Sequence, residues 1–371
     1  MKFICEEGCC SGCMACAAVC PHDAIHLDTS RSGCQAVIDP QRCVGCLACK
    51  QVCPQLNPPS RHAPIASFEG WANNNASRKH GSSGGLAAAL AEAMLGRGGT
   101  VYSCAFSKGE FSFFMAKTME EVRRFSGSKY VKSDASGVYM SILHRLRAGQ
   151  AVLFIGLPCQ VAALRKLSGK HGANLITAEL ICHGTPSPSL LDQYLHEHGH
   201  ALCNANDISF RRKGMFQLLV DGQRTTRCNV RDPYTIAFLE SLSYTDNCYS
   251  CPYAQHERVA DLTLGDCWGS RLPMDEWKRG VSLLLCQTEA GLSLAKEASA
   301  RLEPIAYDQA AAHNAQLRMP SPVPKRRSRY FALLEKGISF STAARLCAPK
   351  AAIRQDIKAM LLKAGLFKTK A

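Results

Sequence analysis

The first part of this 371-residue chain contains one cysteine pattern twice. In each copy, three cysteines are separated by two residues, a fourth follows after three more, and a proline comes next. The two copies are Cys10, Cys13, Cys16, Cys20 and Pro21, and Cys43, Cys46, Cys49, Cys53 and Pro54. Three cysteines at this spacing direct thiolates to three corners of one [4Fe-4S] cubane, while the fourth points to a neighbouring cubane. The segment therefore has to fold around two clusters whose ligands interleave.

This spacing is typical of a two-cluster bacterial ferredoxin, a carrier of single electrons. We expect one [4Fe-4S] cluster to be held by Cys10, Cys13, Cys16 and Cys53. We expect the other to be held by Cys43, Cys46, Cys49 and Cys20.

A disulfide-linked domain and a pair of zinc sites are the two alternative interpretations of the repeat. The sequence shows neither a signal-peptide pattern nor a run of about 18 apolar residues, which predicts a cytoplasmic protein. In a reducing compartment most of the 21 cysteines would stay reduced or metal-bound. Zinc sites do not need eight cysteines in this interleaved register, so iron-sulfur clusters are favoured.

The rest of the chain is long enough, and at 46% hydrophobic residues apolar enough, for a large core beside a small cluster domain. Apolar periodicity predicts helices over 84–95 and 134–147, and a capping box at Thr118 and Glu121 predicts a short helix between them. Strands are expected at 100–106, 151–155, 175–181 and 261–264, and hairpin-like pairs within 211–220 and 261–285. A proline-rich stretch at 54–64 is typical of a linker.

This alternation of strands and helices predicts an α+β / α/β chain whose core is α/β with a mixed sheet. We expect a dicluster ferredoxin-type domain at 1–60. The core follows in two parts, 65–150 and 151–315, and a basic helical tail occupies 316–371.

The formal net charge of +14 is concentrated in that tail. From Ser321 onward, twelve lysines and arginines face only Glu335 and Asp356. The segment 326–368 is expected to be helical, with apolar residues between the basic ones. It could pack on the domain, dock an acidic partner such as ferredoxin, lie on a membrane surface, or be a solvated basic face. No motif of a nucleic-acid-binding module accompanies it, so nucleic acid is not an expected partner.

Three further cysteine motifs occur in the core. Cys159 and Cys182 each follow a predicted strand, and therefore lie at the ligand-binding edge of an α/β sheet. Cys248 and Cys251 form a Cys-x-x-Cys pair before a proline. Together the four could hold a third cubane. The alternatives are a tetracysteine zinc site, a nucleophilic pair of Cys159 with His183, and four unconnected buried cysteines.

Three glycine-containing motifs could contact a nucleotide. Ser83, Gly84 and Gly85 lead into a predicted helix whose amides suit a phosphate; a helix capped by serine is the alternative. The other two motifs contribute an amine, an aromatic face and close backbone approach, or else belong to ordinary surface and core. Their residues are Lys129, Tyr130, Gly265, Asp266, Trp268 and Gly269.

These motifs, in this order from Cys10 to Gly269, resemble the coenzyme F420 hydrogenase/dehydrogenase beta subunit family. The resemblance implies FAD beside a [4Fe-4S] cluster in the core, with Cys159, Cys182, Cys248 and Cys251 as that cluster's ligands. It also implies flavin contacts from the three glycine motifs. The chain departs from the family at two positions: Leu157 stands where threonine is frequent, and Cys267 where an aromatic is frequent.

The resemblance implies an oxidoreductase in which electrons pass between the ferredoxin-type clusters, the inner cluster and FAD, in either direction. His183 could deliver a proton or hydrogen-bond the flavin or substrate, or be a structural neighbour. The expected partners are ferredoxin or another low-potential carrier, and a small-molecule substrate or the deazaflavin F420. The alternative from another class is an electron-transfer subunit that has no substrate of its own.

Overall fold

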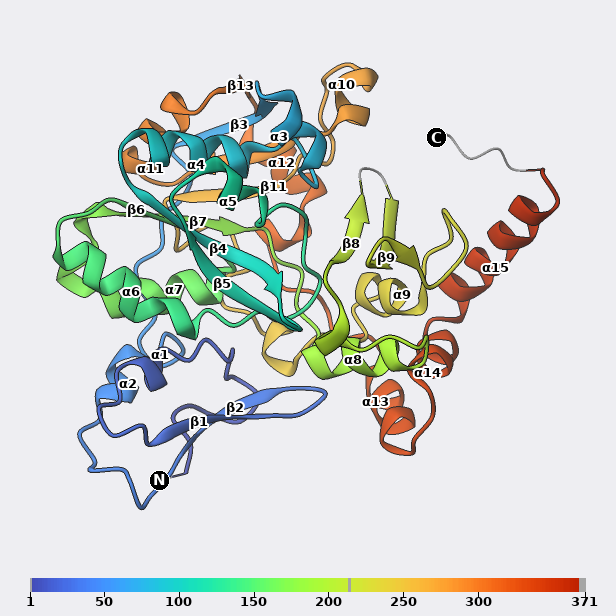
Figure 1. Cartoon of the computed structure of the whole chain (residues 1–371), viewed down its shortest axis with the longest axis horizontal. Helices are drawn as coiled ribbons and strands as arrows, with labels where there is room; N and C mark the ends of the chain where they lie inside the picture. The colour runs from blue at the N-terminus through green and yellow to red at the C-terminus, as the bar shows by residue number, and fades with distance from the viewer. Residues whose placement is uncertain (1, 213–214, 367–371) are drawn as a thin grey trace.

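The computed structural model describes residues 2–212 and 215–366. Its centre is an eight-stranded mixed sheet in the order β13-β3-β12-β11-β7-β6-β4-β5 (Figure 1). Strands β4, β6, β7 and β11 are parallel, and the other pairings are antiparallel. The strands are β3 Ala66–Ala72, β4 Thr100–Ser107, β5 Glu110–Ala116, β6 Val152–Gly156, β7 Leu175–Leu180, β11 Leu262–Asp266, β12 Ser282–Cys286 and β13 Ala300–Pro304.

Helices cover both faces of this sheet because its central strands are apolar on both sides. All of β6 is buried. One face packs against α4 (Leu86–Gly96) and α11 (Glu289–Glu297), the other against α6 (Ser136–Arg147) and α7 (Pro158–Ser168) (Figure 1). The predicted α/β core with a mixed sheet is therefore confirmed.

Shorter elements surround the sheet and mostly lie where periodicity and capping signals predict structure. The Thr118 capping box begins α5, as expected. The remaining helices around the core are α3 Asn75–His80, α5 Met119–Arg123, η1 Gly169–Asn174, η3 Asp246–Cys248, α10 Met274–Arg279, α12 Tyr307–His313 and η4 Ala315–Leu317.

The N-terminal module packs against the α6 and α7 side of the core (Figure 1). It consists of the antiparallel pair β1 (Ile25–Thr29) and β2 (Cys34–Ile38), with the short helices α1 (Ala15–Ala18) and α2 (Ala48–Val52). Ala15 is part of the apolar cluster beneath α6 and α7. The Tyr139 hydroxyl of α6 donates to the Cys13 carbonyl at 2.9 Å, so the cysteine loop is anchored directly to the core.

A second lobe is built around the hairpin expected at 211–220. Its antiparallel sheet contains β8 (Ile208–Arg212), β9 (Met215–Val220) and β10 (Gln223–Arg224). The helices α8 (Pro188–His196) and α9 (Pro233–Leu239) pack beside it, with η2 (Leu202–Asn204) between them in sequence.

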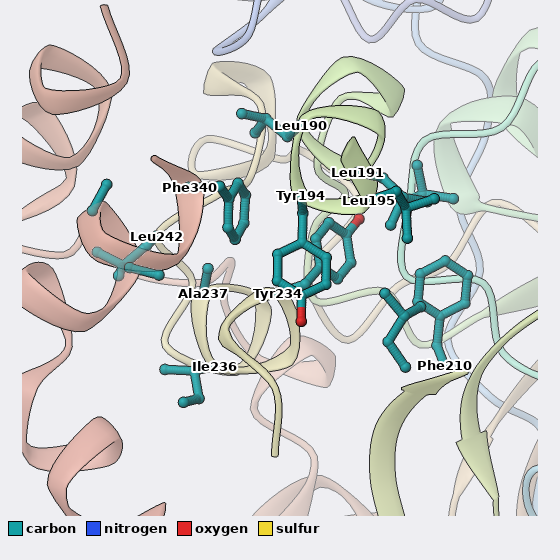
Figure 2. Packing of buried hydrophobic residues seen from close by; sticks show 14 of the residues in the cluster. Leu190, Leu191, Tyr194, Leu195, Phe210, Tyr234, Ile236, Ala237, Leu242 and Phe340 are labelled. Atoms are coloured by element: carbon teal, nitrogen blue, oxygen red, sulfur yellow. The ribbon is translucent and has the colours of Figure 1, made fainter. Parts of the chain in front are cut away.

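The predicted tail is helical and contributes to this second lobe. It forms α13 Arg327–Glu335, α14 Phe340–Cys347 and α15 Pro349–Lys363; Lys368 lies outside the described residues. Phe340 is fully buried against the rings of Tyr194 and Tyr234, with ring centroids at 5.4 and 5.7 Å (Figure 2). The first two helices are therefore core elements rather than a loosely attached extension.

The last helix, α15, projects away from the body of the protein (Figure 1). Ile353, Ile357 and Met360 recur at helical spacing and are exposed by 57%, 52% and 64%. Within the described residues, no helix combines the length and apolarity needed to cross a bilayer.

Replacing Phe340 by alanine should lower the free energy of unfolding by about 3–5 kcal/mol, because it empties a packed aromatic site. The matched control Ile353→Ala removes an exposed side chain and should change it by less than about 0.5 kcal/mol. Urea unfolding under anaerobic conditions, followed by fluorescence and circular dichroism, measures both values. Equal, small effects would show that α14 does not stabilise the lobe.

Candidate functional site

Four cysteines from distant parts of the sequence line one cavity at the carboxyl edge of the sheet. Cys159 lies in the first turn of α7, directly after β6, and Cys182 lies two residues after β7. Because β6 and β7 are adjacent parallel strands, their carboxyl ends bring these two thiols to the same edge. Cys248 and Cys251 complete the lining from the η3 segment.

Backbone pairing brings the Cys182 and Cys248 loops together. Pro186 and Tyr244 form an isolated bridge, and the Thr245 amide donates to the Thr185 carbonyl at 3.0 Å. Gly184 has φ +138°, and a Cβ there would lie 2.3 Å from the Tyr244 ring. Only glycine allows this approach, so the glycine of the Cys-His-Gly motif has a packing role.

Burial and mutual repulsion oppose ionisation of these thiols. Burial, with a smaller contribution from neighbouring cysteines, raises the pKa of Cys159 well above its usual value and that of Cys182 to about 12, although Lys132 lowers both. The pKa of Cys251 is raised for the same reasons. Thiolates gathered in this way are stabilised when a metal centre binds, because metal coordination deprotonates the ligand.

The N-terminal cysteines form two groups that mix the two copies of the repeat. Cys20 lines a cavity with Cys43, Cys46 and Cys49. In the other group, Cys10, Cys16 and Cys53 share one buried cluster, and Cys13 interacts electrostatically with Cys10 and Cys53. The two groups contain the same cysteines as the two sets of cluster ligands that the spacing of the repeat predicts.

Two cysteines outside the repeat also lie beside the first group. Cys5 is buried against Cys10 and Cys53, and the Cys34 thiol donates to the Cys10 carbonyl at 3.5 Å. The spacing of the repeat carries no signal for either contact, since both depend on how β2 and the first residues fold back over the cluster loop.

The inner cavity and the N-terminal module share a wall. Ser11, Gly12 and Cys13 line the same cavity as the four core cysteines. Lys132, which carries no sequence signal, lines it as well. The two cysteine-rich regions are therefore neighbours in space, although more than 100 residues separate Cys13 from Cys159.

The first two glycine motifs meet at a loop contact. The Ser128 amide donates to Ser82 Oγ at 2.7 Å. Ser83 does not cap the following helix: its hydroxyl donates to the Val281 carbonyl, and Gly85 is the N-cap of α4 with φ +83°. The Gly84 amide donates to Ser282 Oγ at 2.8 Å, and a Cβ on Gly84 would lie 2.4 Å from the Gly70 carbonyl oxygen. Gly84 is thus required for packing on the sheet.

The side chains of Lys129 and Tyr130 make contacts with different parts of the structure. The half-buried Lys129 ammonium donates to the carbonyls of Phe125 and Ser126 at 2.6 and 3.0 Å. Burial lowers its pKa to about 8, although Cys104 and Asp207 oppose the shift. The Tyr130 ring stacks on Phe238 at 4.2 Å, between the core and the second lobe.

The third motif forms a polar group with a residue that sequence analysis did not select. Arg211 of β8 pairs with Asp266 at the end of β11, with N–O distances of 2.5 and 3.2 Å. The same guanidinium lies 5.8 Å from the Trp268 ring centroid, and it interacts electrostatically with the Tyr130 side chain. Trp268 is half-buried at this position. The only sequence signal at Arg211 is its place in a hairpin-like stretch, and that pattern predicts a strand rather than a binding site.

The remaining predicted site residues are His183, Gly265 and Gly269. The exposed His183 side chain lines the rim of the inner cavity, near enough to Asp266 for an electrostatic interaction. Gly265 packs against Ile181, and Gly269, with φ +83°, packs against the His313 ring. The structure therefore gathers Tyr130, Asp266, Trp268 and His183 at one edge, and holds Gly84 and Gly269 in protein contacts.

Comparison with protein families agrees with this architecture. Residues 9–56 match the 4Fe-4S dicluster domain. Residues 67–139 match the N-terminal part, and residues 149–308 the C-terminal part, of the coenzyme F420 hydrogenase/dehydrogenase beta subunit. No curated protein matches the chain.

Among solved structures, the chain is similar to one in the xenon-derivatised F420-reducing [NiFe] hydrogenase complex from Methanosarcina barkeri. The sequence identity is 17% and the TM-score 0.45, over 79% of this chain and 91% of that one.

The dicluster domain and the α/β core define an electron-transfer iron-sulfur protein. The chain belongs to the coenzyme F420 hydrogenase/dehydrogenase beta subunit family, whose members are subunits of oxidoreductases.

The Lys129 amine should become reactive at an unusually low pH. Because burial lowers its pKa to about 8, the neutral, nucleophilic form should be half-populated near that pH in the folded chain. In the urea-unfolded chain the midpoint should return to the ordinary 10.5. Competitive acetylation across pH, with mass spectrometry of the Lys129 peptide, measures both. Identical midpoints in the folded and unfolded chains would show that the site does not desolvate this amine.

Proposed function

We propose that this protein is an iron-sulfur flavoprotein oxidoreductase with three [4Fe-4S] clusters and one FAD. Single electrons pass between the two N-terminal clusters, an inner cluster and the flavin, and from there to or from a small-molecule substrate or the deazaflavin F420. The observation that carries the proposal is the cavity in which four core cysteines meet the loop of the first N-terminal cluster.

The inner cluster is proposed to be held by Cys159, Cys182, Cys248 and Cys251. These four cysteines line one cavity, and four thiolates are the ligand set of a [4Fe-4S] cubane. A tetracysteine zinc ion would use the same residue types, and the family that the chain matches favours the iron-sulfur cluster.

A nucleophilic role for Cys159 is less well supported. A reactive cysteine needs a lowered pKa, whereas burial and the neighbouring thiols raise that of Cys159. Its strongest electrostatic partners are Lys132, Cys251 and Cys182 rather than His183. The thiol is therefore better suited to ligate a metal centre than to attack a substrate.

FAD would bind near the joined glycine motifs and the Tyr130–Arg211–Asp266 group. When bound, FAD converts hydride transfer into single-electron steps. The start of α4, which has no side-chain cap, and the Lys129 ammonium would hold phosphate oxygens. Tyr130 and Trp268 supply aromatic surface, and Arg211 is held in place by Asp266. His183 is the proposed proton donor at the rim of the cavity.

Ferredoxin or another low-potential carrier is the proposed partner at the outer cluster. Cys43 and Cys46 are exposed, and the apolar side chains Val44 and Leu47 beside them are 64% and 52% exposed. A partner could approach this cluster closely. The exposed apolar stripe and basic residues of α15 are a second proposed contact, with an acidic subunit or a membrane surface.

The alternative function is an electron-transfer subunit that serves a partner enzyme and has no substrate of its own. Membership in a family of hydrogenase and dehydrogenase subunits is compatible with it. The two functions differ at the flavin, because a chain that exchanges hydride with a substrate needs FAD bound beside the inner cluster.

Changing Cys159 to serine should remove one cluster and leave two. The anaerobically purified protein should contain about twelve irons and one FAD per chain, and the variant about eight irons, since each cubane holds four. The control Cys203→Ser changes an exposed cysteine far from the cavity lining and should retain all twelve. Iron, sulfide and zinc analysis gives the counts. An unchanged iron content in Cys159→Ser, or zinc in place of iron, would refute the inner cluster.

Binding of FAD should raise the pKa of Lys129. A phosphate near the ammonium stabilises its charged form, so the acetylation midpoint should move above 8 when FAD is added to flavin-free protein. Riboflavin, which has no phosphate, is the control and should leave the midpoint unchanged. Equal midpoints with FAD and riboflavin would place the phosphates away from Lys129.

A further inference from the structure

Lys132 lies on a segment that is held from two sides. Its amide donates to the Pro186 carbonyl at 2.8 Å. Val131 before it is buried, and Ser133 after it accepts two hydrogen bonds from the Gln160 side-chain amide, at 3.0 and 3.1 Å. Because Gln160 is itself in the first turn of α7, one residue after Cys159, the segment has a defined position relative to the inner cavity.

The Lys132 side chain spans the boundary between the two cysteine-rich regions. Its ammonium donates to the Ser11 carbonyl at 3.0 Å, inside the loop that carries Cys10 and Cys13. It also lines the cavity of the four core cysteines. The groups that act most strongly on its charge are thiols on both sides: Cys34 and Cys10 of the N-terminal module, and Cys248 and Cys159 of the core.

A cation in this position interacts with both redox centres at once. Each [4Fe-4S] cluster with four thiolates is anionic and gains one further negative charge on reduction. A positive charge in a partly desolvated site therefore stabilises the reduced form of either cluster more than its oxidised form. The ammonium is fixed by the Ser11 carbonyl, so it does not need to reorganise when an electron moves.

We propose that Lys132 is a positive charge shared by the first N-terminal cluster and the inner cluster, and that it raises the midpoint potentials at both ends of the electron step between them. The proposal builds on the three-cluster function proposed above. In this step, one electron leaves the reduced cluster of Cys10, Cys13, Cys16 and Cys53 and is taken up by the oxidised cluster of the core. No bond forms or breaks, and Lys132 keeps its proton.

The test compares three variants in anaerobic holoprotein. Lys132→Met removes the charge with little change in volume, and Lys132→Arg keeps it. Lys117→Met removes one positive charge from the exposed residue that follows β5, and so controls for total charge. Iron content, thermal unfolding and redox titrations followed by electron paramagnetic resonance are recorded for each.

Lys132→Met should keep its iron and have more negative midpoints at both the inner cluster and the first N-terminal cluster. The expected equilibrium shift against the reduced form is about tenfold, or about 59 mV for a one-electron couple. Lys132→Arg and Lys117→Met should remain near wild type. If Lys132→Met loses iron or unfolds earlier, the same comparison is made with Lys132→Gln, a polar variant that can still donate to the Ser11 carbonyl.

The outcomes separate the two proposals. Twelve irons in every protein with unchanged midpoints, or an equal shift in Lys132→Arg, would overturn the role of the Lys132 charge and leave the three-cluster function standing. Only eight irons in the wild-type protein would overturn that function and, with it, the role of the shared charge. A negative shift confined to the variants that lack the charge would support both.

Discussion

The constraint on which most of the structure depends is the grouping of four cysteine thiols at one edge of the sheet. Cys159 and Cys182 are brought there by adjacent parallel strands, and the Cys248 loop is joined to them by the Pro186–Tyr244 bridge. Without a metal centre such thiols stay protonated, because burial opposes ionisation and each thiolate would repel the next; a bound metal centre stabilises the thiolate form. Backbone pairing joins the surrounding loops, and this holds the four cysteines in place before any metal centre binds.

That edge is also the place where the separate parts of the chain meet. The N-terminal module contributes the Ser11–Cys13 loop, which is anchored by Tyr139 and Lys132. The second lobe contributes Arg211, whose pairing with Asp266 links β8 to the end of β11. Electron transfer requires short distances between centres, and these contacts hold the cysteine-rich module and the core against each other as one continuous structure.

Much of the core could be predicted from periodicity because the elements are locally consistent. The buried strands after Gln150 and Asn174 and the Thr118 capping box are signals within a few residues. The basic tail shows where such reasoning is weaker. Its composition leaves a solvated basic face and packing on the domain both open, whereas Tyr330 and Phe340 are fully buried in the apolar cluster that contains α8 and α9.

The glycine motifs show the same limit at the level of single residues. Gly84 and Gly184 appear in motifs that suggest ligand contact, but their lack of a Cβ is required by Gly70 and Tyr244, which only the fold brings close. By itself, the sequence determined the family, the dicluster domain and the α/β core, because cysteine spacing and apolar period are local properties. The tertiary structure alone decided that Arg211 pairs with Asp266 and that Lys132 lies between the two cysteine-rich regions, because those contacts join residues 55 and 121 positions apart.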